Sequence, residues 1–123
     1  MEKILISINP EHVEKILAGT KKYEYRRRVA KDVSSLVIYE TAPIKKVVAE
    51  VEVLETLALS PEQLWNKTKN ESGTSKEFFD KYFENKEAAY AYKLGKIREY
   101  SEPKELSEFG VKVAPQSYVI LEK

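Results

Sequence analysis

The chain has 123 residues, of which 42% are hydrophobic and 33% are charged, and its formal net charge is +1. This length and composition predict one globular domain over residues 1–123, large enough to bury a core of its own. The sequence contains no cysteine and a single histidine. These counts exclude disulfides, thiolate nucleophiles and histidine-rich metal centres, and we expect neither a metal nor a cofactor.

No apolar run approaches the roughly 20 residues of a membrane span, and the first residues show no signal-peptide pattern. We therefore expect a cytoplasmic protein without a membrane partner. Its charge is unevenly distributed, because six basic residues lie close together in the sequence: Lys21, Lys22, Arg26, Arg27, Arg28 and Lys31. A nearly neutral protein can thus carry a locally positive surface, although such a run is often only the solvated face of a strand.

The first third of the chain predicts a strand, a helix and a second strand. The apolar run 4–8 is typical of a buried strand, and Asn9 and Pro10 then suit the start of a helix that Gly19 can end. Residues 22–28 alternate with a period of two. This pattern predicts a strand with its tyrosines on the core side and its charged residues, Lys22, Glu24, Arg26 and Arg28, facing outward.

Two further strands are expected at 34–40 and 45–59. In the second of them one face is apolar and the other is largely acidic, with the apolar face formed by Val47, Ala49, Val51 and Val53. Ser60, followed by proline and by Gln63 three residues later, predicts a capping box at the start of a helix. Residues 66–75 are polar and are interpreted as an exposed loop before another helix begins at Thr74 or Ser75.

The last part of the chain predicts a helix and two strands. Four aromatic residues at helical spacing form one stripe, which is typical of core packing rather than of a base-stacking platform: Phe78, Phe79, Tyr82 and Phe83. Residues 88–100 form a strand whose phase slips near Gly95, where a bulge is expected, and Gly110 ends a short turn or helix. A closing strand covers 115–122. The fold class is therefore α+β, a small and mostly antiparallel barrel or curled sheet with flanking helices.

Three ordered blocks of sequence resemble a known family. The segment from Gly19 to Arg26, "GTKKYEYR", resembles the GxKxxExR signature of the ASCH family, a branch of the PUA-like β-barrels named after activating signal cointegrator homology. "VIYETAPIKKVVAEVEV" is similar to the second block of that family, and "APQSYVIL" is similar to its closing strand. Together the blocks cover most of the chain, and the helical segment 60–86 is the least similar part.

The resemblance implies a PUA-like barrel whose signature strand lines a cleft that binds RNA or nucleotides. Some small relatives deacetylate acetylcytidine with the signature lysine and a threonine nucleophile, and ribonuclease activity is also described in the family. Lys21 matches the signature lysine, whereas Glu24 occupies the position of that threonine. This sequence therefore departs from the deacetylase pattern at the position of the nucleophile.

Two groups of residues are candidates for the site. Lys21, Glu24 and Arg26 can converge on a cleft, where the arginine binds a phosphate and the glutamate accepts from a base amino group. The alternative is that Glu24 and Arg26 only pair with each other or with a glutamate on a neighbouring strand. The second group lies at the ends of two strands that the family topology brings to one mouth, and it consists of Tyr39, Thr41, Lys45 and Ser117. The complete set of expected ligand residues is Lys21, Glu24, Arg26, Arg28, Tyr39, Thr41, Lys45 and Ser117.

Three functions remain open from the sequence. The first is a module that binds RNA, a nucleotide or a nucleoside in a polar cleft with a basic rim, acting as a regulator of transcription, translation or RNA metabolism. The second is a metal-independent ribonuclease or an amidohydrolase, with catalytic groups Lys21, Glu24, Tyr39 and Lys45. The third is a protein-interaction module that uses the aromatic helix 78–83. His12 is expected to be a neutral imidazole on the surface.

Overall fold

The computed structural model describes residues 2–121, which form a six-stranded sheet with three α-helices. In chain order the elements are β1 (Glu2–Ile8), α1 (Pro10–Leu17), β2 (Tyr23–Arg26), β3 (Val33–Glu40), β4 (Lys46–Leu59), α2 (Pro61–Thr68), α3 (Lys76–Tyr82), β5 (Ala89–Lys104) and β6 (Tyr118–Ile120). Short 3-10 turns at Lys69–Glu71 and Leu106–Phe109 complete the described part of the chain.

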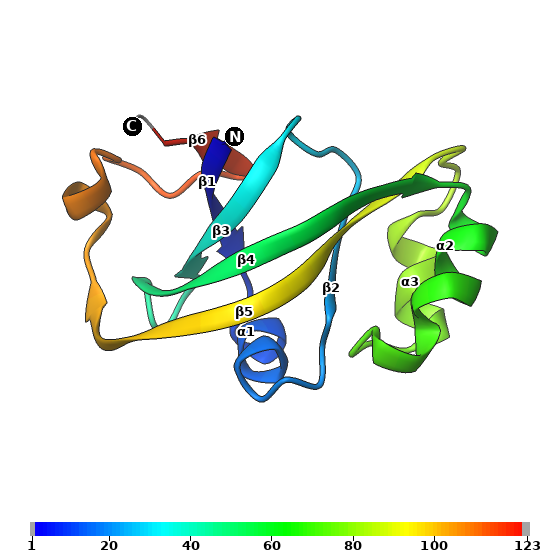
Figure 1. Ribbon diagram of the computed structural model, residues 1–123, viewed down its shortest axis with the longest axis horizontal. Coiled ribbons are helices and arrows are strands. Elements are labelled where there is room, and N and C mark those ends of the chain that lie inside the picture. The colour runs from blue at the N-terminus through cyan, green and yellow to red at the C-terminus, as the bar shows by residue number, and fades with distance from the viewer. Residues whose placement is uncertain (1, 122–123) are drawn as a thin grey trace.

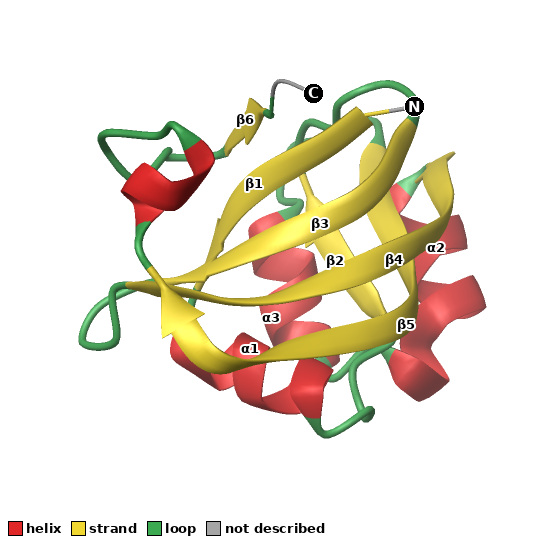
Figure 2. Ribbon diagram, turned by 60° about the vertical axis from the view of Figure 1, so that its left-hand side comes forward, coloured by secondary structure: helices red, strands yellow, loops and turns green. Residues whose placement is uncertain are grey.

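The sheet has the order β2-β5-β4-β3-β1-β6 and curls into a half-barrel (Figure 2). β1 and β3 are parallel, and the other neighbouring strands are antiparallel. The α+β class and the mostly antiparallel curled sheet are therefore confirmed. The parallel pair arises because α1 and β2 lie between β1 and β3 in the chain, so the connection between these strands is a crossover.

The helices cover the sheet at two places (Figure 1). α1 contributes Val13 and Ile16 to the main core, which also contains buried residues of β1, β3, β4 and β5. α2 and α3 pack beside each other where β4 ends and β5 begins, and there Leu64 and Phe79 meet the two tyrosines of β2. β2 is therefore held between the barrel interior and the helical pair.

Several local predictions are confirmed. Ser60 begins α2 with a complete capping box, and Ser75 begins α3 by accepting from the backbone N–H of Phe78. Gly19, with a φ of 81°, follows the end of α1. The pairing of β4 with β5 shifts register between Val51 and Val53, opposite the Gly95 region, which is the expected bulge.

Two packing predictions are wrong in detail. A register shift between Val47 and Ala49 changes the phase of β4, so Val48 joins Ala49 in the main core and Val47 packs in a separate cluster with Leu5. The prediction of an exposed loop at 66–75 is met only in part: most of these residues are exposed, but α2 continues to Thr68, and Thr68 and Ser72 are 1% and 2% exposed. The closing strand is shorter than expected, and residue 122 of it lies outside the described residues.

Candidate functional site

A cavity of about 510 Å³ opens beside β2, and we call it the signature cavity because residues of the GxKxxExR segment line it. Its walls come from the end of β1, the start of α1, β2, the turn between β3 and β4, α3 and the segment before β6. Six of the eight expected ligand residues line it: Lys21, Glu24, Arg26, Tyr39, Thr41 and Lys45. The fold thus brings together residues that are up to 24 positions apart (21 to 45) in the sequence.

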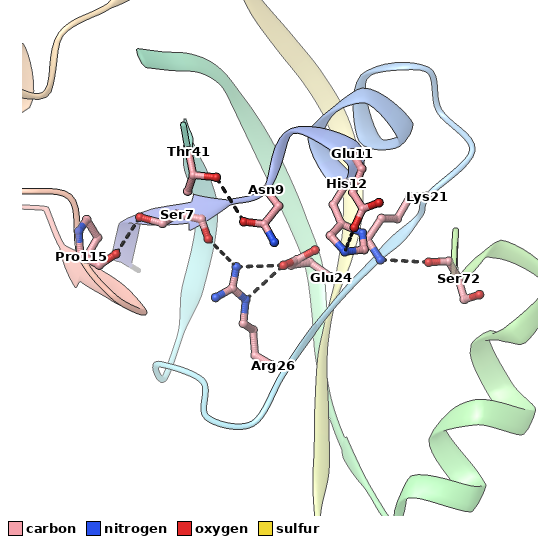
Figure 3. Close-up of polar contacts among 10 residues, drawn as sticks. All are labelled: Ser7, Asn9, Glu11, His12, Lys21, Glu24, Arg26, Thr41, Ser72 and Pro115. Carbon is pink, nitrogen blue, oxygen red and sulfur yellow. Dashed lines mark hydrogen bonds and ion pairs between the residues drawn. The ribbon is translucent and has the colours of Figure 1, made fainter. Parts of the chain in front are cut away.

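Glu24 and Arg26 form an ion pair inside this cavity (Figure 3). Arg26 Nη2 lies 2.9 Å and Nε 3.1 Å from Glu24 Oε2, and Nη2 also donates to the Ser7 carbonyl at 2.8 Å. The side chain of Arg26 is only 15% exposed and that of Glu24 only 7%. The expectation that these residues face outward into solvent is wrong, because the curled sheet brings the end of β1 over this face of β2.

The alternative prediction, that Glu24 and Arg26 only form an ion pair, is therefore met in part. Glu24 and Arg26 do pair with each other, but in the cavity wall rather than on a solvated surface. The glutamates of β4 have other partners, since Glu50 pairs with Lys3 and Arg98. A carboxylate held by a guanidinium fork fixes both groups, so the pair presents a preformed polar floor to a ligand.

Lys21 is buried at the inner end of the cavity, with 3% of its surface exposed. Its Nζ donates to the Ser72 carbonyl at 3.0 Å and lies 5.0 Å from the centre of the Tyr25 ring. Burial lowers the pKa of this amine below its ordinary value, while the Glu24 carboxylate opposes the shift. Lys21 therefore holds a neutral, proton-accepting form more readily than a surface lysine does.

The segment that supports Lys21 depends on a glycine. Gly73 has a φ of 66°, and a Cβ at this position would lie 2.6 Å from Lys21 Cβ and 3.1 Å from Lys21 Cα. A side chain would clash with Cβ of Lys21, which the lysine backbone holds in place, and the positive φ also favours glycine here. The polar segment 66–75 is thus a supporting wall that the sequence pattern did not reveal.

His12 also lines the signature cavity, and its expected place on the surface is wrong. Its side chain is 14% exposed, Nε2 lies 3.7 Å from the Glu11 carboxylate, and the buried Nδ1 has no hydrogen-bond partner among the described residues. Burial and, next, the nearby Lys21 charge lower the pKa of the imidazole. The ring is therefore neutral at pH 7.

The opposite side of the cavity is polar and less buried. Thr41 Oγ1 donates to Asn9 Oδ1 at 3.1 Å, so the side chain of Asn9 contacts Thr41 and makes no hydrogen bond as the cap of α1 (Figure 3). Ser7 Oγ donates to the Pro115 carbonyl at 2.7 Å. Lys45 is exposed at the rim, in a left-handed conformation with a φ of 55°. Tyr39, at the end of β3, is 7% exposed.

Ser117 and Arg28 do not share this cavity. Both line a second cavity of about 840 Å³, together with Arg27 and Lys31. Gln116 lines the signature cavity, whereas the next residue, Ser117, lines the second cavity. The expectation that Ser117 lies at the same mouth as Tyr39 is therefore not met.

The signature cavity also contains residues that sequence reasoning missed: Ser7, Asn9, Phe78 and Tyr82. The aromatic stripe was assigned to the core, and Phe79 and Phe83 are indeed buried at 1% and 3% exposure. Phe78 differs, because it is 43% exposed and faces the cavity. Only the position of α3 beside α1 distinguishes it from its neighbours, and no local pattern carries that information.

Among residues 2–121, no group of three or more histidine, cysteine or acidic side chains is placed to hold a metal ion. No helix in the same part of the chain is long and apolar enough to cross a membrane. The polar groups of the cavity are thus a cationic and hydrogen-bonding set with one carboxylate, Glu24.

Comparison with proteins of known sequence gives relatives of several kinds. An ASCH domain-containing ribonuclease of Zymomonas mobilis is 30% identical over 95 residues, which are 76% of this chain and 64% of the relative. The large ribosomal subunit protein uL22 of Ureaplasma parvum is 32% identical over 98% of this chain, and the ATP synthase subunit alpha of that organism is 29% identical over the same share. The chain spans only 39% and 15% of the length of these last two proteins.

Solved structures of an ASCH protein are also similar to this chain. The ASCH protein of Zymomonas mobilis superposes with a TM-score of 0.89 at 28% identity, over 98% of this chain and 88% of the other. A tyrosine-to-phenylalanine variant of that protein reaches a TM-score of 0.90 at 26% identity, over 100% and 92% of the two chains. The family model described as the ASCH domain matches residues 6–104. This match includes the signature strand and the strands around it, and the chain belongs to the ASCH domain family.

Proposed function

We propose that this protein binds single-stranded RNA in the signature cavity. The observation that carries the proposal is that Lys21, Arg26 and Lys45 line one cavity whose lining contains a single carboxylate, that of Glu24. Three positive groups and one negative group leave a formal excess of two positive charges in a concave polar site. Such a site attracts a phosphate backbone, although the whole chain has a net charge of only +1.

The dimensions and chemistry of the cavity suit an RNA segment. Its volume of about 510 Å³ lies within the range of ordinary ligand sites. Arg26 already holds Glu24 and the Ser7 carbonyl through Nε and Nη2, so its position is fixed before a ligand arrives. Membership of the ASCH family and the ribonuclease among its relatives support an RNA-related role. Binding without cleavage would suit a regulator of RNA metabolism.

The proposal is tested by removing the charge at the rim without straining the backbone. Lys45→Asn suits this purpose, because asparagine tolerates the left-handed conformation that Lys45 adopts. Fluorescence anisotropy with a labelled eight-nucleotide RNA in chelator should show about tenfold weaker binding. The slope of log affinity against log salt should fall by about 0.7, the value for one phosphate contact on a single strand.

The matched control is Lys67→Gln on the exposed side of α2, which lines neither the signature cavity nor the second cavity. It removes the same charge from the protein and should leave both affinity and salt slope unchanged. Equal losses in the two variants would mean that RNA responds to net charge alone. Unchanged binding by Lys45→Asn would contradict the proposed site.

A second candidate function, metal-independent cleavage of RNA, is favoured by the buried Lys21. Cleavage of this kind requires a base that takes the proton of the 2′-hydroxyl as its oxygen attacks phosphorus, and an acid that protonates the departing 5′-oxygen. Lys21, with its lowered pKa, suits the base. Tyr39 carries a hydroxyl in the same cavity that suits the acid, and Arg26 and Lys45 can stabilise the charge on phosphorus oxygens.

Cleavage is tested on the same RNA in chelator, with products separated by size and examined for 2′,3′-cyclic phosphate ends. Lys21→Gln should abolish turnover even at RNA concentrations that saturate the variant, because the amide cannot accept the proton but keeps a donor near the Ser72 carbonyl. A substrate with 2′-O-methyl groups should bind and remain intact. Turnover that persists in Lys21→Gln would exclude this mechanism, and absent turnover in the wild type would leave the binding function alone.

A further inference from the structure

We propose that Phe78, together with Tyr82 and His12, forms a stacking subsite for one unpaired nucleobase of the bound RNA. We call these three residues the aromatic wall. The inference rests on the proposed function and deepens it, because it divides the cavity into a part that holds phosphate and a part that holds a base.

The aromatic wall is built from two helices. Phe78 and Tyr82 are four residues apart on α3, and their rings are nearly parallel, with an interplanar angle of 9° and centroids 6.1 Å apart. His12 on α1 meets Phe78 from the side, with centroids 5.5 Å apart and an angle of 56°. All three line the signature cavity. The ring of Phe78 is therefore held on two sides by other rings.

The exposure of Phe78 is what calls for a ligand. Phe78 as a residue is 43% exposed, whereas Phe79 and Phe83 on the same segment are almost fully buried. Leaving part of a phenylalanine side chain in water forgoes favourable burial, and Phe78 also lines the signature cavity. A flat apolar surface at the edge of a cationic site fits a ligand that combines an aromatic ring with a negative charge, as a nucleotide does.

The neighbouring groups direct the base to Phe78 rather than to Tyr82. The guanidinium of Arg27 lies 4.1 Å from the centre of the Tyr82 ring, and its Nε donates to the Tyr82 carbonyl at 2.8 Å. One face of Tyr82 is therefore already covered by a cation. His12 is neutral because its pKa is lowered, so it adds an uncharged ring to the wall.

A protein partner fits this surface less well than a base does. Protein docking sites are contiguous apolar patches, and here the burial of Phe79 and Phe83 limits the exposed aromatic surface of α3 to one ring beside charged groups. The interaction hypothesis for the helix 78–83 depends on several exposed aromatics. The structure therefore argues for a single planar ligand group.

The test compares two RNA probes on each variant: an eight-nucleotide oligouridine and an oligomer of the same length with abasic sugars throughout. Wild-type protein should prefer the oligouridine by about fivefold or more, and up to a hundredfold, since one stacked base contributes about that much. Phe78→Ala should lose most of this preference and bind the abasic probe as tightly as wild type does. Phe78→Tyr should keep the preference, because it keeps the ring.

Leu54→Ala is the matched control. Leu54 is an exposed apolar residue on β4, 56% exposed, and it lines neither the signature cavity nor the second cavity. This variant should behave as wild type with both probes. Circular dichroism melting of each variant should confirm that the fold is retained, as expected for an exposed ring.

Three results would overturn the inference. If Phe78→Ala keeps the preference for oligouridine, the base does not stack on Phe78, and the proposed RNA site stands as long as Lys45→Asn still weakens binding. If Phe78→Ala weakens both probes equally, the ring has a general structural role and is not a base subsite. If wild-type protein binds neither probe, the subsite and the proposed function fail together.

Discussion

The buried ion pair between Glu24 and Arg26 should be much stronger than a surface pair. The strength of the pair can be measured with a double-mutant cycle that consists of Glu24→Gln, Arg26→Met and the double variant. Each substitution removes one charge; Glu24→Gln keeps the shape of the side chain, and Arg26→Met keeps an unbranched but shorter apolar chain. The pair has two short contacts to one carboxylate oxygen, and the side chains are 15% and 7% exposed, so solvent screens the interaction little.

The magnitude follows from what each single variant leaves behind. Arg26→Met leaves the Glu24 carboxylate buried without its guanidinium and also removes a donor to the Ser7 carbonyl. Breaking a buried pair in this way costs about 3–5 kcal/mol. Glu24→Gln retains an acceptor for Arg26, so about 1–3 kcal/mol is expected. The double variant leaves no unpaired charge at the pair, and we therefore expect a coupling free energy of about 2 kcal/mol.

Urea denaturation of the four proteins, followed by circular dichroism, measures this coupling. Unfolding slopes must agree across the set, so that differences in midpoint report stability. A coupling of about 2 kcal/mol supports a buried pair that holds the floor of the cavity. A value below about 0.5 kcal/mol, which is typical of solvent-exposed pairs, would show that solvent screens this pair as well.

Three further predictions concern the support of the site. Gly73→Ala should destabilise the protein by about 2–4 kcal/mol in urea denaturation, because a Cβ would meet the backbone of Lys21, whereas Gly110→Ala, with a similar φ and open space, should cost only about 1 kcal/mol; equal losses would show that the clash is relieved. Since the folded-state pKa of His12 is lowered, wild type should lose stability relative to His12→Phe as pH falls below about 6.5, and parallel pH profiles would contradict this. Ser60→Ala should cost about 1 kcal/mol in thermal melts through the lost cap of α2, and an unchanged melting temperature would argue against it.

Local sequence signals predicted the elements of this fold well. The Ser60 capping box, the Ser75 helix start, the turn at Gly19 and the bulge near Gly95 depend on residues that are neighbours in the chain. Each of these features could therefore be predicted from the local sequence. The parallel pairing of β1 with β3 and the order of the strands depend on contacts between distant segments, and local patterns do not encode them.

The residues of the candidate site likewise fall into those that local sequence predicts and those that depend on contacts between distant segments. The signature segment led to Lys21, Glu24 and Arg26, and the structure places all three in one cavity. Alternation placed Glu24 on a solvated face, because a period of two shows that a strand has two faces but not that both are covered. His12 and Phe78 were missed for a related reason, since their role depends on the approach of α3 to α1.

The claim that RNA occupies the signature cavity is tested most directly by photo-crosslinking. A single-stranded RNA that carries 4-thiouridine and 2′-O-methyl sugars would be irradiated with the wild-type protein, and the modified peptides identified by mass spectrometry. We expect crosslinks to the segments that contain Phe78 and Tyr39, which are 39 positions apart in the sequence (39 to 78) but line one cavity. Crosslinks confined to residues outside that cavity, such as the exposed part of β5 at 99–103, would contradict it.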